Sequence, residues 1–154
     1  ATFFYPNAAP QAAGFNQSKE LWVGLEDHVL AYADATDQRV SVFTAPVLEP
    51  DDPPYRGIRI PRRFWKIAAW NAADPGGEPV LAAAGFVLDQ SDLIAAASVA
   101  PLPGFRTFQV PVRDIAELAG VELGPLVDAD VLVAVAGARA SRWTQLSTPD
   151  EIRL

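Results

Sequence analysis

Two long apolar segments separated by a short turn constrain the fold more than any other feature of this sequence. Residues 64–72 and 79–87 are rich in alanine, β-branched and aromatic side chains, and Asp74-Pro75-Gly76-Gly77 lies between them. The glycines supply turn geometry and the proline fixes its own φ, so the chain can reverse its direction here. The sequence therefore predicts an antiparallel hairpin.

Three other segments have the character of strands, and a fourth is ambiguous. Residues 2–6 are apolar, residues 39–43 alternate polar with β-branched or aromatic side chains, and residues 108–112 show a similar pattern. Pro46 is expected to end the second of these strands, because proline cannot donate a hydrogen bond to a sheet. Residues 126–137 are rich in Val, Ala and Leu, so they fit either a strand or a turn of buried helix.

Two helices are expected beside these strands. Residues 17–35 place apolar side chains at three- and four-residue steps, which predicts an amphipathic helix with Asn16 or Ser18 as its N-cap. Its core-facing stripe consists of Leu21, Trp22, Leu25, Val29 and Ala33. A shorter helix should be capped by Asp114 and end at Gly120. An antiparallel sheet flanked by helices is an α+β fold.

The composition favours one domain and excludes several kinds of site. Half of the 154 residues are apolar, which is enough for one core over residues 1–154 and too little for two. The absence of cysteine excludes disulfides, thiolate metal ligands and cysteine nucleophiles. No apolar run reaches the roughly eighteen residues of a membrane helix, so no membrane is expected as a partner. With a net charge of −7, any contact with nucleic acid must be local.

A series of short motifs carries the strongest functional signal. Residues 7–11 read Asn-Ala-Ala-Pro-Gln, Asn16 follows, and residues 21–26 read Leu-Trp-Val-Gly-Leu-Glu. Later come Val-Phe-Thr-Ala-Pro-Val at residues 42–47 and Ile-Pro-Arg-Arg-Phe-Trp-Lys at residues 60–66. In this order the segments resemble the signatures of the DNA/RNA non-specific endonucleases, the ββα-metal nucleases that include endonuclease G-like enzymes. The resemblance covers nearly the whole chain and implies a ββα-metal nuclease-like fold.

This resemblance implies an Mg²⁺ site and assigns roles to four residues. In the family one Asn side chain holds Mg²⁺ among several waters, and Asn16 matches that ligand, although an ordinary N-cap is its simpler role. Glu26 matches a catalytic carboxylate that orients water at the metal, and is otherwise a solvated helix residue. Asn7 and Gln11 match positions at the pocket wall. Two more residues than usual separate Asn16 from the Trp, so they must precede the helix or form a local bulge.

A basic segment follows the second expected strand. Five of the twelve cationic residues fall within eleven positions: Arg56, Arg59, Arg62, Arg63 and Lys66. One interpretation is a set of phosphate contacts along a substrate groove, with Arg56 and Arg59 as binding residues and Tyr55 or Trp65 available for stacking. The other, which we favour, is a solvated loop and strand edge with Trp65 in the core.

The catalytic histidine of the family is missing from this sequence. That histidine belongs to an Asp-Arg-Gly-His motif upstream of Asn7, and no such motif occurs here. His28 lies inside the amphipathic helix, where a packing or surface role is expected. Because the chain begins at Ala1 without an initiator methionine, we expect it to be the carboxy-terminal piece of a cleaved nuclease. An amino-terminal fragment of the same protein would then supply the histidine as general base.

Several alternatives stay open from the sequence alone. The chain is expected to act as an endonuclease on DNA and RNA when complemented, without a readable preference between them, since the chemistry acts on the phosphodiester. Alternatively it is a catalytically inactive binding module that kept the nuclease fold, or an unrelated carbohydrate- or protein-binding α+β domain with coincidental motifs. A homodimer is possible. A secreted or periplasmic location is the expectation for its compartment.

Overall fold

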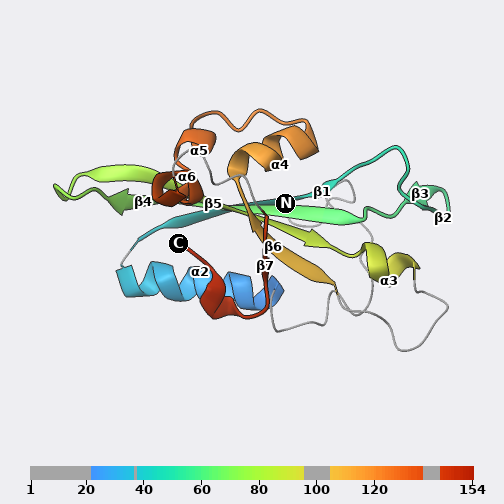
Figure 1. The fold of residues 1–154 in the computed structure, drawn as a ribbon, viewed down its shortest axis with the longest axis horizontal. Coiled ribbons are helices and arrows are strands. Elements are labelled where there is room, and N and C mark those ends of the chain that lie inside the picture. Colours follow the sequence, from blue (N-terminus) through green and yellow to red (C-terminus); the bar gives the residue numbers. More distant parts are fainter. Residues whose placement is uncertain (1–21, 37, 96–104, 137–142) are drawn as a thin grey trace.

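The computed structural model describes residues 22–36, 38–95, 105–136 and 143–154, which form a sheet with helices on both faces (Figure 1). The elements in chain order are α2 (Trp22–Thr36), β1 (Val40–Val47), β2 (Pro54–Tyr55), β3 (Ile58–Arg59), β4 (Arg63–Ala73), β5 (Pro79–Asp89), α3 (Ser91–Ala95), β6 (Arg106–Val110), α4 (Val112–Ala119), α5 (Pro125–Asp128), α6 (Val131–Ala136), β7 (Thr144–Leu146) and the 3₁₀ helix η3 (Pro149–Glu151). Among the described helices, none is both long and apolar enough to cross a membrane.

The β4–β5 hairpin forms the middle of a five-stranded antiparallel sheet ordered β1-β4-β5-β6-β7. Its turn has the predicted chemistry. The Asp74 carboxylate accepts hydrogen bonds from the main-chain N–H groups of Gly76 and Glu78, each at 2.8 Å, and Gly77 adopts a φ of 85°. A side chain that caps the turn and a glycine at positive φ fix the register of the pairing locally. The predicted hairpin is confirmed; β4 is one residue longer at each end than expected, and β5 continues two residues further, to Asp89.

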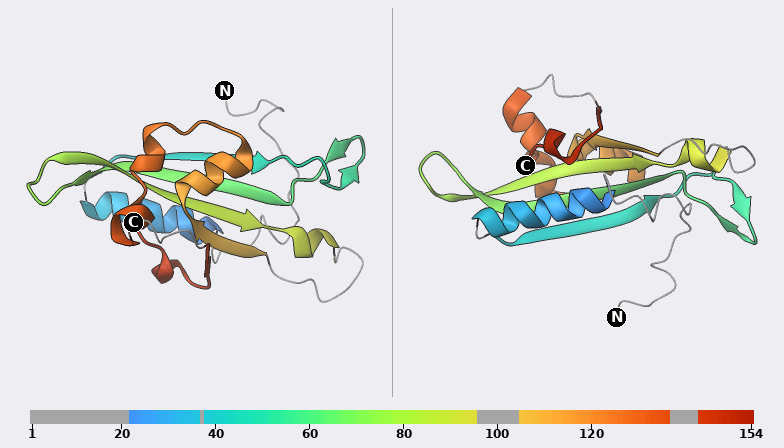
Figure 2. Two further views of the ribbon diagram at one scale, coloured as in Figure 1. Left: turned by 45° about the horizontal axis from the view of Figure 1, so that its top comes forward. Right: turned by 90° about the horizontal axis from the view of Figure 1, so that it is seen from below.

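Both faces of this central hairpin are buried, which explains why its strands read as continuous apolar runs. On one face, Leu25 and Val29 of α2 belong to a core with Trp70 and Phe86, and the carboxy-terminal Ile152 joins them. The other face carries a second core, whose buried members are Val47, Trp65, Ile67, Ala83, Val87, Val110, Val112 and Ile115. Figure 2 shows the sheet between α2 on one side and α4 and α5 on the other.

Helix α4 packs closely against Gly85 of β5. A Cβ atom at this position would lie 2.8 Å from Cδ1 of Ile115 and 2.8 Å from the carbonyl oxygen of Val110, which is main chain and cannot move aside. We expect Gly85→Ala to lower the free energy of unfolding by about 1–3 kcal/mol, as overpacking of a filled core does. Urea denaturation measures this. A change within about 0.5 kcal/mol would contradict the close approach.

Three sequence expectations need correction. Strand β1 does not end before Pro46 but continues to Val47, with Pro46 opposite Phe64; β1 lies at the edge of the described sheet, where a missing N–H is tolerated. Helix α4 begins at Val112, with Pro111 as its N-cap, so Asp114 lies in its first turn and does not cap it. The strand expected over residues 108–112 is β6, which spans Arg106–Val110; Pro111, with a φ of −57°, follows it, and the helix starts three residues earlier than a cap at Asp114 would place it.

Other expectations are confirmed where the structure describes them. Helix α2 covers the described part of the predicted residues 17–35, and Gly120 ends α4 in the left-handed conformation, with φ of 62°. Of the ambiguous residues 126–137, 126–128 and 131–136 are helical in α5 and α6, and Asp130 between them forms an isolated parallel bridge to Ala83. The α+β class is confirmed as well. The predicted strand at residues 2–6 and the proposed N-caps of the first helix lie outside the described residues.

Candidate functional site

The residues expected around the metal lie at the start of the chain. Asn7, Gln11 and Asn16 fall outside the described residues. The backbone of Glu26 lies in α2, one residue after the fully buried Leu25, but its side chain is not described. Leu25 and Val29 anchor this helix to the sheet, so the backbone position of Glu26 is fixed relative to the strands. The roles assigned to these four residues therefore remain predictions.

The loop between β1 and β4, which carries the basic segment, is organised around the buried Asp52. Its Oδ2 accepts a hydrogen bond from the main-chain N–H of Glu49 at 2.9 Å, and its Oδ1 accepts one from that of Arg62 at 3.2 Å. The main-chain oxygen of Asp52 accepts a bond from Nη1 of Arg59 at 2.8 Å, and that of Pro53 accepts one from the N–H of Ile60 at 2.9 Å. One carboxylate thus joins the two ends of the loop.

Three of the five cations in the basic segment are used inside the protein. Arg62 pairs with Asp51 at 2.8 Å, Arg63 forms a two-pronged pair with Glu49, and Lys66 is buried, with 2% of its surface exposed. Trp65 is buried in the core, as expected. These three cations therefore have structural roles, but Arg63 and Lys66 lie on β4 inside the sheet and not on the solvated strand edge that we expected.

The other two cations, Arg56 and Arg59, have no acidic partner among the described residues. They belong to the β2–β3 hairpin, in which Tyr55 pairs with Ile58 across a two-residue turn. The guanidinium carbon of Arg56 lies 5.2 Å from the centre of the Tyr55 ring, within range of a cation–π contact. Figure 1 shows this hairpin projecting from the sheet at the end toward which the start of α2 points.

Asp130, which the sequence did not single out, is a buried carboxylate on the opposite face from α2. Only 1% of its surface is exposed, and its two oxygens accept hydrogen bonds from the main-chain N–H groups of Val112 at 2.8 Å and Leu132 at 2.9 Å. Burial raises the pKa of Asp130 above its ordinary value of 3.8, and the nearby Asp114 raises it further. This carboxylate joins the starts of α4 and α6, which is a structural role.

The raised pKa of Asp130 gives a pH-dependent prediction. A raised pKa means that the folded state favours the protonated form, so the stabilisation is fully present below pH 3.8 and is lost as the pH rises through the folded-state pKa. Asp130→Asn replaces one acceptor by an NH₂ group facing an N–H, which should destabilise the fold by about 1–3 kcal/mol. The excess stability of the wild type over this variant should therefore shrink as the pH rises. Urea unfolding of both proteins over a pH series measures it; an excess that grows with pH would contradict the shift.

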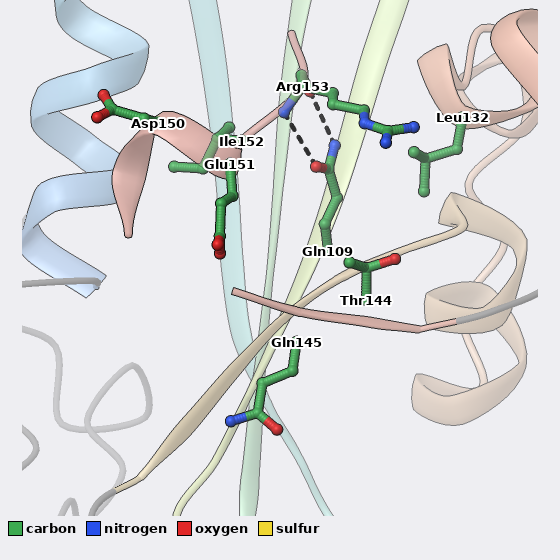
Figure 3. Close-up of a pocket in the computed structure, with 8 residues that line it drawn as sticks. All are labelled: Gln109, Leu132, Thr144, Gln145, Asp150, Glu151, Ile152 and Arg153. Atoms are coloured by element: carbon green, nitrogen blue, oxygen red, sulfur yellow. Dashed lines mark hydrogen bonds between the residues drawn. The ribbon is translucent and has the colours of Figure 1, made fainter. Parts of the chain in front are cut away.

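A second polar feature is an open pocket of about 460 Å³ beside β6, β7 and η3 (Figure 3). The Gln109 side chain crosses it, donating to the main-chain oxygen of Arg153 at 2.8 Å and accepting from its N–H at 3.0 Å. The other lining residues are Leu132, Thr144, Gln145, Asp150, Glu151 and Ile152. This two-bond contact holds the carboxy-terminal segment beside the sheet, so Gln109 acts as a structural clamp.

Comparison with known proteins decides the family. The sequence profile of the DNA/RNA non-specific endonucleases matches residues 1–130, more than four fifths of the chain. The chain belongs to this family. The antiparallel sheet with flanking helices is consistent with a ββα-metal nuclease-like fold, and the alternative of an unrelated domain with coincidental motifs is wrong.

A curated relative extends the comparison to a longer protein. The chain is 34% identical over 149 residues to an uncharacterized protein, y4fB, of Sinorhizobium fredii (strain NBRC 101917 / NGR234). The alignment covers 92% of this chain and 22% of that relative, so the chain spans about a fifth of the relative's length. No solved structure matches the chain significantly. The family match ends at residue 130, so Arg153, whose main chain binds Gln109, lies in the part of the chain that the match does not cover.

For this nuclease family member, the donor chemistry fits the metal that the family implies. No group of three or more His, Cys, Asp or Glu side chains suited to a metal occurs within the described ranges. A site built from one amide oxygen and water needs no such group, because Mg²⁺ prefers hard oxygen ligands and retains most of its water. Asn16 and Glu26 offer such oxygens. His28 is half-buried in α2, which agrees with the packing or surface role expected for it.

Proposed function

We propose that this chain supplies the metal-binding side of an Mg²⁺-dependent, sugar-non-specific endonuclease that cleaves phosphodiester bonds in DNA and RNA. The observation that carries the proposal is the family match over residues 1–130. That range includes the segments with Asn16 and Glu26, and the hairpin that presents Arg56 and Arg59.

The chain's own residues have distinct tasks in this mechanism. The Asn16 amide oxygen holds the ion, and the Glu26 carboxylate accepts hydrogen bonds from surrounding water and orients it. Asn7 and Gln11 form part of the pocket wall. When bound, Mg²⁺ supplies positive charge that stabilises the phosphate as negative charge accumulates in the transition state. The amides cannot act as bases and Glu26 is assigned to orienting water, so in this proposal the general base comes from elsewhere.

The general base in this proposal is a histidine from an amino-terminal segment of the same protein, outside residues 1–154. The family's Asp-Arg-Gly-His motif does not occur in the sequence, and His28 is part of the helix that packs on the sheet. Strand β1 offers a docking place for such a segment. It is an edge strand of the described sheet, eight residues long, and leaves Val42 46% and Phe43 47% exposed. An edge of this length can pair with an added strand.

The alternative is a catalytically inactive module that keeps the nuclease fold and binds a partner. Its support is the same missing Asp-Arg-Gly-His motif. Nicking of supercoiled plasmid and degradation of RNA, each measured with Mg²⁺ and with EDTA, separate the two functions. The endonuclease proposal requires metal-dependent cleavage of both substrates once the histidine segment is present. Cleavage no greater than in EDTA under those conditions would establish the inactive module.

A further inference from the structure

We propose that the β2–β3 hairpin is a platform for single-stranded nucleic acid, on which Tyr55 and Ile58 stack an unpaired base while Arg56 and Arg59 contact the adjoining phosphates. The inference rests on the proposed endonuclease function, because it names the form of substrate that this surface accepts. Three properties of the hairpin support it: the hydrogen bonds that brace its base, its exposed aromatic and aliphatic surface, and two arginines without an acidic partner among the described residues.

Hydrogen bonds to the preceding loop brace the hairpin, whose two strands have only two residues each. Arg56 and Gly57 adopt φ values of 49° and 86°, the geometry of the tight turns that match strand twist. Glycine adopts a positive φ at little energetic cost, whereas a residue with a Cβ atom, such as Arg56, rarely does so. The bonds that Arg59 and Ile60 make to the main-chain oxygens of Asp52 and Pro53 brace the base of the hairpin. A braced hairpin loses little conformational entropy when it binds a ligand.

The apolar surface of the hairpin is large for so small an element. Tyr55 is 49% exposed and Ile58 is 54% exposed, and they are cross-strand partners on the same face. An aromatic ring exposed beside a guanidinium is the combination that stacks nucleobases without sequence preference, since every base has a π-face. Bases in a duplex present only their edges, whereas unpaired bases present their faces. The surface therefore suits single strands and unpaired stretches.

The hairpin carries two positive charges on a protein whose net charge is negative. The chain has a net charge of −7, and within the basic segment only Arg56 and Arg59 lack both burial and an acidic partner among the described residues. Phosphate contacts form where cations are not already neutralised. Each arginine directly follows one member of the exposed Tyr55–Ile58 pair in sequence, and the Arg56 guanidinium lies 5.2 Å from the centre of the Tyr55 ring.

Binding in the absence of cleavage tests the platform directly. A fluorescent single-stranded DNA of about twelve nucleotides is titrated with the 154-residue protein in EDTA, and the anisotropy is followed. Tyr55→Ala should weaken binding roughly tenfold and Tyr55→Phe should leave it nearly unchanged. Arg56→Gln should weaken binding and make the slope of log Kd against log salt shallower by about one. Arg39→Gln, which removes an exposed cation just before the opposite end of β1, is the matched control and should bind as the wild type does.

Circular dichroism first establishes that each variant is folded. Wild-type binding too weak to detect, or a Tyr55→Ala variant that binds as tightly as Arg39→Gln, would overturn the platform. Equal affinity for the duplex of the same sequence would overturn its preference for single strands. The proposed endonuclease function fails separately, through absence of Mg²⁺-dependent cleavage, because the binding measurement in EDTA does not depend on catalysis.

Discussion

Asn16→Ala should reduce Mg²⁺-dependent cleavage of plasmid by roughly a hundred- to a thousandfold. In the proposed site the Asn16 amide is the one protein ligand of the ion, so its removal takes away both the affinity for Mg²⁺ and the placement of its charge beside the phosphate. Losses of that size follow removal of one preorganised group that stabilises charge in a transition state. The measurement is the initial rate of plasmid nicking by the complemented protein, over a range of Mg²⁺ concentrations.

A second substitution separates the metal role of Asn16 from a capping role. Serine is as good an N-cap as asparagine but lacks the amide oxygen at that reach, so Asn16→Ser should keep the stability and lose the activity. If capping were the only role, Asn16→Ala would instead cost about 1 kcal/mol of stability and leave the rate per folded molecule unchanged. Asn71→Ala, which removes an exposed asparagine from β4, is the matched control and should cleave as the wild type does.

Local sequence signals predicted the fold well where the structure is set by neighbouring residues. The β4–β5 hairpin depends on an Asp-Pro-Gly-Gly turn, whose hydrogen bonds all lie within five residues, and α2 depends on a repeating apolar stripe. The end of α4 was also predictable, because Gly120 adopts a left-handed conformation that glycine readily supplies. Each of these features is readable without knowing what lies elsewhere in the chain.

Features fixed by distant contacts were not predictable. A proline usually ends a strand that has neighbours on both sides, but it can lie within a strand at the edge of a sheet. Residues 39–47 do not reveal that β1 has a neighbour on one side only in the described sheet. Residues 125–128 and 131–136 form helices that pack on β5 around the buried Asp130, whose partners include Val112, eighteen positions away. The sequence shows Asp130 as an isolated carboxylate in an apolar run, but it does not show which main-chain N–H groups donate hydrogen bonds to it.

The candidate site shows the same division. The order of the short motifs sufficed to predict the family, because each motif lies within a few residues of sequence. The sequence of the basic segment did not show how its cations would be used. The acids that neutralise Arg62 and Arg63 belong to the preceding loop, and only the fold shows which acid meets which arginine. The structure thereby reduces five candidate phosphate contacts to two.

Adding an amino-terminal segment that carries the Asp-Arg-Gly-His motif should raise Mg²⁺-dependent nicking at least a hundredfold above that of either polypeptide alone. A positioned general base contributes about a hundred- to ten-thousandfold to a rate, and the sequence lacks the Asp-Arg-Gly-His motif whose histidine would supply it. The measurement mixes the two purified polypeptides at equal concentration, with supercoiled plasmid as substrate. The same segment with its motif histidine changed to alanine should restore no activity.

The edge of β1 gives this complementation a structural test. If the added segment extends the sheet there, Phe43→Lys should weaken the association, because Phe43 is about half exposed and a charge at a strand edge discourages pairing. Raising the concentration of the segment should then recover the nicking rate, whereas it cannot do so for Asn16→Ala, whose defect lies in the chemistry. A segment that binds the chain tightly and still gives no cleavage above EDTA would exclude the split nuclease, since both halves of the active site would then be together without activity.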